Sequence, residues 1–341
     1  MMRNRLLVVL ALVVGVATLG VASAQAERQT IYLAFVSNNS HEFWNIADRG
    51  TQKAASDLGA RVEFRRPQRG TAAEQKQIVE DLIAKGVQGI AISPNDAVNQ
   101  ADFFNHDVAT KIPLICSDSD LPEGSKRLCY VGTDNFAAGR AAGELLKQAL
   151  PSGGQVIIFV GKLDVRNAVE RRAGVIAALG GFATFAEAHQ AASGRYPLRL
   201  GSYEVLGVMT DDAKKEKCKA NAEDALTRYP RLAGMVGLWE YNPPAILAAV
   251  SEARLLGRVK IVGFDENEET LQGVIDGHIA GTIVQNPFEF GYQSIKLLHQ
   301  VVQGDRSGIP EGGVVHVPHR VITPGNVAEF RTELRRLKGK P

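Results

Sequence analysis

The sequence has little of what marks a nucleic-acid-binding, metal-binding or catalytic protein. Its 39 Lys and Arg residues nearly balance its 37 Asp and Glu residues, so no excess of positive charge points to nucleic acid as a partner. It lacks glycine-rich phosphate loops, the Gly-x-Ser-x-Gly elbow, and the His-Glu-x-x-His and Cys-x-x-Cys motifs. His316 and His319 form the one close histidine pair, on an extended stretch that turns them to opposite faces. We therefore expect no cofactor, no metal site and no enzymatic activity.

Cysteine and tryptophan are also scarce, with three and two residues in 341. Cys116 and Cys129 lie at the ends of two neighbouring predicted strands, whereas Cys218 lies in a polar helical stretch. In an oxidising compartment the sequence leaves two states open, namely one Cys116–Cys129 disulfide or three unpaired thiols. The overall composition, with 45% hydrophobic and 22% charged residues, is that of a globular protein and excludes a disordered chain.

The N-terminal segment has the features of a signal peptide. Residues 1–5 contain two arginines and no acid, and residues 6–21 form an almost unbroken apolar run that ends in small residues. This run is shorter than the roughly 20 residues that span a membrane. Two Ala-x-Ala cleavage sites overlap, and we expect cleavage after Ala26, with Ala24 as the alternative. Removal of residues 1–26 takes away two arginines and leaves an exported, periplasmic chain without formal net charge.

From residue 30 onward, short apolar strands alternate with amphipathic helices. In the first half we expect strands at 31–36, 61–64, 89–93, 113–116 and 128–131, and helices at 43–58, 72–85 and 97–110. After a turn-forming cluster at 151–154, we expect strands at 155–160, 203–207, 234–238, 260–264 and 280–284, and helices at 169–178, 214–228, 243–255 and 269–276. This alternation predicts an α/β fold with two doubly wound parallel-sheet lobes. A helix at 288–302, an extended stretch at 313–323 and a helix at 326–337 are expected to complete both sheets.

In doubly wound sheets a ligand lies beyond the carboxyl ends of the strands, so the residues that follow each strand are the candidates for a site. These positions are rich in planar polar and aromatic side chains, namely Asn38, Asn39, Phe43, Trp44, Asp118, Asp164, Arg166, Asn167, Trp239, Tyr241, Asn242, Asp265, Gln285 and Asn286. Two aromatic rings that face each other across a cleft, surrounded by amides, carboxylates and a guanidinium, suit a molecule with apolar C–H faces and many hydroxyls. Such a molecule is a sugar or polyol.

Plainer interpretations of the same residues stay open. A tryptophan is often a core residue because its large apolar area favours burial. Asp118 and Asp265 are also of a type that caps helices or forms turns.

Eight stretches, in this order, resemble a periplasmic sugar-binding protein of the ribose-binding type, a type I periplasmic binding protein that serves as the substrate-binding component of an ABC transporter. They are 34–39 with Phe43 and Trp44, 89–95, 113–116 with Asp118, 130–135 with Gly139, Asn167 with Arg171 and Gly174, Asn242, 262–265, and Gln285. The resemblance covers nearly all of the chain after residue 26. It implies sugar contacts from Asn39, Phe43, Trp44, Asp118, Asn167, Asn242, Asp265 and Gln285.

Two departures from the family pattern speak against ribose itself, because Ser119 and Val169 stand where ribose-type members carry arginines. Arg166 is added to the expected contacts as a guanidinium that approaches the ligand from another direction. Trp239, three residues before Asn242, is added as a residue that either lines the pocket or packs beneath it.

The resemblance also implies how the chain is organised and what it works with. Residues 27–134 and 286–318 would form the N-terminal lobe, and residues 135–285 and 319–341 the C-terminal lobe, with three crossings near Asn135, Gln285 and Pro318. A sugar bound between the lobes would stabilise their closed form, which the membrane permease subunits of an ABC transporter would recognise. We expect a monomer with no nucleic-acid partner.

Other functions share some of these features. A sugar-sensing receptor or chemotaxis partner would have the same fold and cleft. A sugar-responsive repressor needs N-terminal DNA-binding helices, which residues 1–26 do not supply. An exported sugar-acting enzyme is opposed only by the missing motifs.

Overall fold

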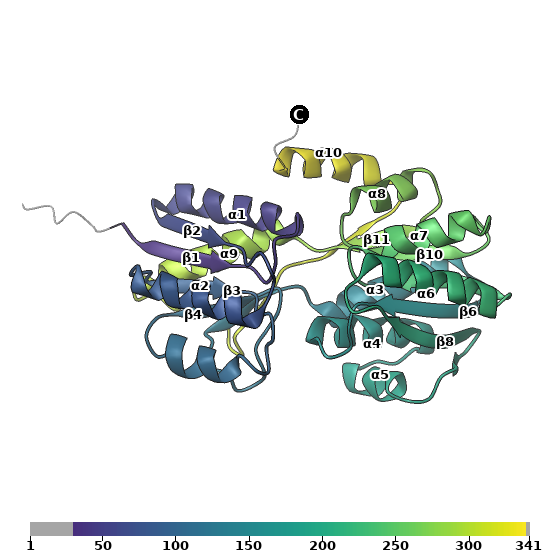
Figure 1. Ribbon diagram of the computed structural model, residues 1–341, viewed down its shortest axis with the longest axis horizontal. Coiled ribbons are helices and arrows are strands. Elements are labelled where there is room, and N and C mark those ends of the chain that lie inside the picture. The colour runs from purple at the N-terminus through teal and green to yellow at the C-terminus, as the bar shows by residue number, and fades with distance from the viewer. Residues whose placement is uncertain (1–29, 339–341) are drawn as a thin grey trace, which may run out of the picture. The chain divides into compact units, whose positions relative to one another are not determined.

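In the computed structural model, residues 30–338 are described, and the expected signal peptide at residues 1–26 lies outside them. Within the described residues, no helix is long and apolar enough to cross a membrane. The described chain carries one sheet of six strands and one of seven (Figure 1).

The first sheet is parallel throughout, in the strand order β12-β5-β4-β3-β1-β2. Its strands are β1 (Tyr32–Val36), β2 (Arg61–Arg65), β3 (Gly89–Ile92), β4 (Leu114–Ser117), β5 (Cys129–Gly132) and β12 (Val314–His316). Its helices are α1 (Phe43–Leu58), α2 (Ala72–Ala84), the π-helical η1 (Phe103–Val108) and α9 (Pro287–Val302). Alternate strand residues enter opposite core layers, so that Leu33 and Phe35 pack with α1 and α9, whereas Ala34 and Val36 pack with α2 and η1. We call this sheet and its helices the first lobe.

The second sheet has the strand order β13-β11-β10-β9-β6-β8-β7 and is parallel except at its two edges, where β13 and β7 pair antiparallel. Its strands are β6 (Gly154–Val160), β7 (Leu198–Leu200), β8 (Tyr203–Thr210), β9 (Leu232–Gly237), β10 (Lys260–Phe264), β11 (Gly281–Val284) and β13 (Arg320–Ile322). Its helices are α3 (Asn135–Ala149), α4 (Arg166–Gly180), α5 (Phe185–Ala192), α6 (Lys215–Arg228), α7 (Asn242–Glu252), α8 (Glu268–Ile275) and α10 (Val327–Leu337). Helices α3 and α4 cover one face, and α6 and α7 cover the other. These elements form the second lobe.

The chain passes between the two sheets three times. It leaves the first sheet after β5 at residues 133–134, returns after β11 at 285–286, and crosses again between β12 and β13 at 317–319. A hydrogen bond of 3.1 Å from the Thr133 hydroxyl to Gln285 Oε1 joins the first two crossings. The predicted fold, two doubly wound lobes with three crossings, is confirmed.

Glycine allows one pair of helices in each lobe to approach backbone to backbone. A Cβ atom at Gly50 of α1 would lie 1.9 Å from the carbonyl oxygen of Phe288 in α9. In the second lobe, a Cβ atom at Gly139 of α3 would lie 2.2 Å from the carbonyl oxygen of Arg171 in α4. Both distances are far below van der Waals contact, so only glycine fits at these positions. The second contact fixes the part of α4 that carries Arg171.

Some elements differ from the sequence-based expectation. Helix α3 was not predicted because it is rich in Ala and Gly and has few large apolar side chains before Leu145 and Leu146. Helix α5 and strand β7 form an additional segment between α4 and β8 that was also missed. The helix expected at 97–110 is largely replaced by turns followed by η1, and Val98 is 70% exposed there.

The three cysteines are buried and free. In the register of β4 and β5, Cys116 lies opposite Tyr130, and Cys129 lies opposite Ile115. The two cysteines belong to core layers on opposite faces of the sheet, so their sulfur atoms point apart. This arrangement excludes the disulfide and leaves the three thiols. Burial raises the pKa of the Cys129 thiol to about 12, which keeps it protonated.

We expect Gly50→Ala to lower the free energy of unfolding by about 2–3 kcal/mol, because the added methyl group pushes α1 away from α9. Urea unfolding followed by circular dichroism measures this change. Ser56→Ala, at an exposed position of the same helix, is the control and should change stability by less than about 0.5 kcal/mol. A Gly50→Ala protein as stable as the wild type would contradict the close helix contact.

Candidate functional site

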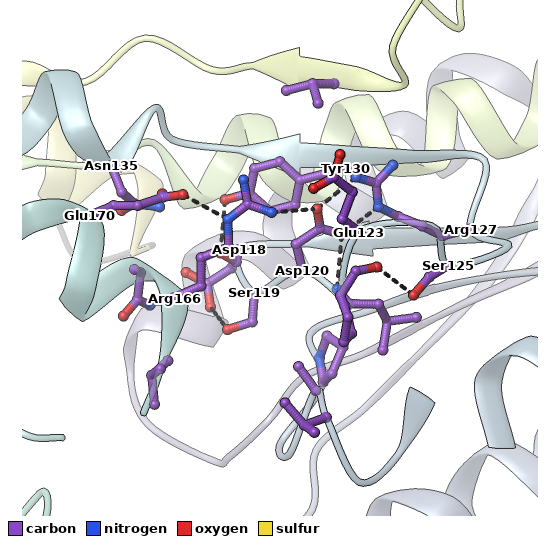
Figure 2. A pocket seen from close by; sticks show the side chains of 18 of the residues that line it. Asp118, Ser119, Asp120, Glu123, Ser125, Arg127, Tyr130, Asn135, Arg166 and Glu170 are labelled. Carbon is purple, nitrogen blue, oxygen red and sulfur yellow. Dashed lines mark hydrogen bonds and ion pairs between the residues drawn. The ribbon is translucent and has the colours of Figure 1, made fainter. Parts of the chain in front are cut away.

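A cavity of about 1220 Å³ lies beyond the carboxyl ends of strands from both sheets. Its walls come from the loops after β3, β4, β5 and β6 and from the residues around the start of β12. Of the ten predicted ligand-binding residues, Asp118, Arg166 and Asn167 line this cavity. Figure 2 labels Asp118 and Arg166 in the cavity wall. Asn39, Phe43, Trp44, Trp239, Asn242, Asp265 and Gln285 do not line it.

Asp118 directly follows β4 and has a left-handed backbone conformation with a φ of 63°. Its N–H donates to Val131 O at 3.1 Å, which fixes the loop against β5. Its Oδ2 accepts from the hydroxyls of Ser93 at 3.1 Å and Ser119 at 3.4 Å, and its Oδ1 accepts no hydrogen bond from the described residues. Burial raises the pKa of this carboxyl, while the charge of Arg171 opposes the rise. The carboxylate is therefore held by neutral donors and keeps one oxygen for a further donor.

Asp265 occupies the corresponding position after β10 in the second lobe. It also has a left-handed conformation, with a φ of 64°, and its N–H donates to Ile283 O at 2.7 Å. Its Oδ1 accepts from Gln285 Nε2 at 2.9 Å. Burial raises the pKa of Asp265 to about 6, against the lowering effects of Arg171 and of the Gln285 hydrogen bond. Both lobes thus present an aspartate in the same backbone geometry, half-buried at Asp118 and buried at Asp265.

Arg171 of α4 links these two aspartates electrostatically, since its charge lowers the pKa of both carboxyls. The side chain is buried, with 2% of the residue exposed. Its Nε donates to Asn135 Oδ1 at 2.9 Å, its Nη1 donates to Leu238 O at 2.9 Å, and its guanidinium lies 4.2 Å from the centre of the Phe264 ring. Arg171 lies in one of the stretches that resemble the family but is not among the predicted contacts. The signal that could have found it is an arginine on the buried face of a helix that follows a strand.

Trp44 belongs to the core of the first lobe. It is 2% exposed and packs against Phe35 and Phe43, with ring-centre distances of 5.9 and 5.1 Å. Its Nε1 donates to Asn38 Oδ1 at 3.1 Å, and the same oxygen accepts from Asn39 Nδ2 at 2.7 Å. Trp44 is therefore a core residue, and its hydrogen bond to Asn38 holds the loop after β1.

Trp239 packs against the core of the second lobe. Its ring lies so close to Gly161 that a Cβ atom there would be 1.9 Å from it. Its backbone N–H donates to Oδ1 of Asn242 at 2.9 Å, and Nδ2 of this fully buried asparagine donates to Asp211 Oδ2 at 2.9 Å. Neither tryptophan lines the cavity, and Trp44 is enclosed by the first core.

Residues 31–306 match the family model described as a periplasmic binding protein domain. The chain belongs to this family. The ribose import binding protein RbsB of Salmonella typhimurium is 26% identical over 298 residues, which cover 86% of this chain and 92% of that protein. The D-allose-binding periplasmic protein of Escherichia coli is 27% identical over 287 residues, which cover 81% of this chain and 85% of that protein.

A solved structure shows the same relation. An ABC transporter solute-binding protein from Burkholderia graminis, in complex with D-arabinose, is 27% identical and superposes with a TM-score of 0.75 over 87% of this chain and 96% of its own. The predicted resemblance to periplasmic binding proteins is confirmed, and these relatives are described as binding proteins rather than enzymes. In this periplasmic binding protein, Asp118 and Asp265 come from different lobes.

We expect Trp44→Ala to lower the free energy of unfolding by about 3–5 kcal/mol, because it leaves a large hole in the first core. Chemical unfolding measures the loss. Phe185→Ala, at an aromatic residue that is 39% exposed, is the control and should cost much less. A loss below about 1 kcal/mol for Trp44→Ala would show that the ring is not a core residue.

The raised pKa of Asp265 predicts a pH-dependent effect of Asp265→Asn. The folded carboxyl keeps its proton up to a pH of about 6, whereas the unfolded chain loses it near pH 4, so the folded wild type loses stability as the pH rises through this window. The variant lacks this loss and should gain stability relative to wild type between pH 4 and about 6. Urea unfolding at several pH values tests this, with the exposed Asp224→Asn as control. A stability difference that does not change with pH would contradict it.

Proposed function

We propose that the protein is an exported solute-binding protein that captures a sugar or polyol between its two lobes and delivers it to an ABC importer. The observation that carries the proposal is the pair of carboxylates, half-buried Asp118 from the first lobe and buried Asp265 from the second. Each accepts hydrogen bonds from neutral donors through one oxygen, while its other oxygen accepts none from the described residues. Buried acceptors favour a ligand that supplies donors, and hydroxyl groups do so without bringing a charge.

Two further side chains with unpaired polar atoms support a polyhydroxyl ligand. Asn167 lines the cavity, and its buried Oδ1 has no hydrogen-bond partner among the described residues. Nε1 of Trp239 is likewise buried and has no hydrogen-bond partner within residues 30–338. An amide oxygen accepts from a hydroxyl and an indole N–H donates to one. We assign both side chains to the ligand together with Gln285 and Arg171.

Asn39 and Phe43 complete the proposed contacts from the loop after β1. Trp44 supports both of them through the hydrogen bond to Asn38 and its ring contact with Phe43. Asn242 supports Trp239 in the same way, through the bond to its backbone N–H. Trp44 and Asn242 thus act on the ligand through the residues that they hold.

Binding and release follow from the two-lobed architecture. A ligand that contacts Asp118 and Asp265 together is bound best when the lobes are closed, so it shifts the population toward the closed form. The permease subunits would then recognise the closed form. We expect an affinity near micromolar, which corresponds to about −8 kcal/mol.

The names of the relatives support a sugar as the ligand, and the N-terminal segment supports export. The relatives reported above are described as binding ribose, D-allose or D-arabinose, all of them neutral polyhydroxyl molecules. We infer that residues 1–26 direct export and are removed after Ala26, so that the binding protein acts in the periplasm as a monomer.

Thermal unfolding of the mature chain with a ligand panel tests this function. We expect one or a few pentoses, hexoses or polyols to raise the midpoint by several degrees, because they bind only the folded state, and amino acids to leave it unchanged. Asp118→Asn should abolish the shift while the ligand-free protein stays folded. Asp107→Asn, at an exposed aspartate outside the cavity lining, should keep it.

A panel in which an amino acid or a purine shifts the midpoint and no sugar does would overturn the proposed function. Retained sugar binding in Asp118→Asn would show that the site lies elsewhere.

A further inference from the structure

Four side chains of alternating charge form a continuous row along the cavity, from the first lobe to the second. They are Arg127, Asp120, Arg166 and Glu170, and all four line the cavity. Figure 2 shows the Arg166 guanidinium between the carboxylates of Asp120 and Glu170, with Arg127 on the far side of Asp120. We call these residues the charge row.

The first-lobe half of the charge row is fixed within its own lobe. Asp120, in the loop between β4 and β5, has a side chain only 5% exposed. Both of its oxygens accept from Arg127, through Nε to Oδ1 and through Nη2 to Oδ2 at 2.6 Å, and Oδ1 also accepts the Leu121 N–H at 2.9 Å. Arg127 in turn donates from Nη1 to Gly313 O at 2.8 Å, just before β12. Contacts within the first lobe alone therefore fix the position of the Asp120 carboxylate.

The second-lobe half is held in a similar way. Arg166 is the first residue of α4, and Glu170 lies one turn further along the same helix. Nε of Arg166 donates to Glu170 Oε1 at 2.7 Å, and the side chains are 61% and 19% exposed. Nη1 of Arg166 then lies 3.5 Å from Oδ2 of Asp120, and this contact joins the two lobes.

The burial of Asp120 and the fixed position of both side chains place this contact at the strong end of surface ion pairs. An exposed pair gains little because water screens it and two long side chains must be immobilised. Here one partner is nearly buried, and both are already positioned by hydrogen bonds inside their own lobes, which lowers the entropy that the contact costs. Among the ion pairs of residues 30–338, Asp120 is the least exposed acid.

We propose that Arg166 sets the affinity of the site by acting across the two lobes on Asp120, and that it does not contact the ligand. The inference rests on the proposed function for its effect on binding. It differs from the sequence-based expectation that Arg166 contacts the sugar, and it rests on the hydrogen bond of Nε to Glu170 and the ion pair of Nη1 with Asp120. Arg166 is thus a positioning residue whose pair favours the arrangement that brings the two lobes together.

The consequence for binding is a coupling between the ion pair and the ligand. A ligand that contacts both lobes favours the same arrangement as the pair, so each stabilises the state that the other needs. Loss of the pair should therefore weaken every ligand by the same factor. Salt should weaken binding to the wild type for the same reason, because ions screen a partly exposed pair.

Calorimetric titration of the sugars that bind in the panel tests this on the wild type and three variants, namely Arg166→Met, Asp120→Asn and the double variant. Arg166→Met should raise Kd about fivefold for every sugar, the factor expected of a strong surface-type pair. In the Asp120→Asn background the same change should alter Kd by less than about twofold. Arg199→Met is the matched control, because Arg199 forms a pair of 3.6 Å with Glu204 inside the second lobe.

Two results would overturn the proposal. One is a loss that differs strongly between sugars that differ at a single hydroxyl, since it would mean that Arg166 contacts the ligand. The other is an equal loss with and without Asp120. If Asp120→Asn does not fold, salt decides instead: Kd of the wild type should rise with NaCl concentration, Kd of Arg166→Met should stay nearly constant, and parallel salt curves would contradict the proposal.

A ligand-free measurement separates this proposal from the proposed function. Small-angle X-ray scattering at low salt should give a larger radius of gyration for Arg166→Met than for the wild type, and the difference should vanish in 1 M NaCl. Equal radii at low salt overturn the inter-lobe role, whatever the sugar panel shows. A larger radius together with a panel in which no sugar binds would retain the ion pair and reject the proposed function.

Discussion

The burial of one positive charge, the guanidinium of Arg171, is the constraint on which the site depends. Arg171 is 2% exposed, and a guanidinium so deeply buried is stable only when its donors and its charge are compensated. Asn135 and the carbonyl of Leu238 accept its hydrogen bonds, and the Phe264 ring covers one face. Its charge in turn opposes the rise in pKa that desolvation causes at Asp118 and Asp265. The same residue explains why α3 and α4 are so close, because Gly139 of α3 packs on its backbone.

Two halves of unlike sequence reach the same local geometry. Asp118 and Asp265 each follow a strand, each turns into the left-handed region, and each donates its N–H to a carbonyl of the neighbouring strand. A short polar side chain tolerates this conformation better than most residues, which accounts for aspartate at both positions. The turn also directs each carboxylate to the sheet edge where parallel strands end, which is where ligands of doubly wound folds lie.

Local elements with a clear hydrophobic pattern were predictable, whereas close packing was not. Helix α1 has the predicted bounds, and β10 coincides with the predicted strand at 260–264, because large apolar side chains recur there with the period of each element. Helix α3 was missed because glycine and alanine carry its contacts with α4. In the site, Asp118 and Asp265 stood out as polar residues after strands. Arg171 did not, since its partners lie in α3, just after β9 and in β10 and are adjacent only in the folded chain.

The three crossings were an implication of the family resemblance. By itself, the sequence determined the fold class, the two series of alternating strands and helices, and the sheet edge at which polar residues gather. These features follow from the order and period of apolar residues, which a linear pattern records. Only the tertiary structure decided that Trp44 is core, that Cys116 and Cys129 lie on opposite faces, and that Arg166 is bound by Asp120 and Glu170. Those outcomes depend on which face of a sheet a side chain points to and on which residue, distant in sequence, packs against it. Register and packing between segments set both, and the period within one segment carries no information about them.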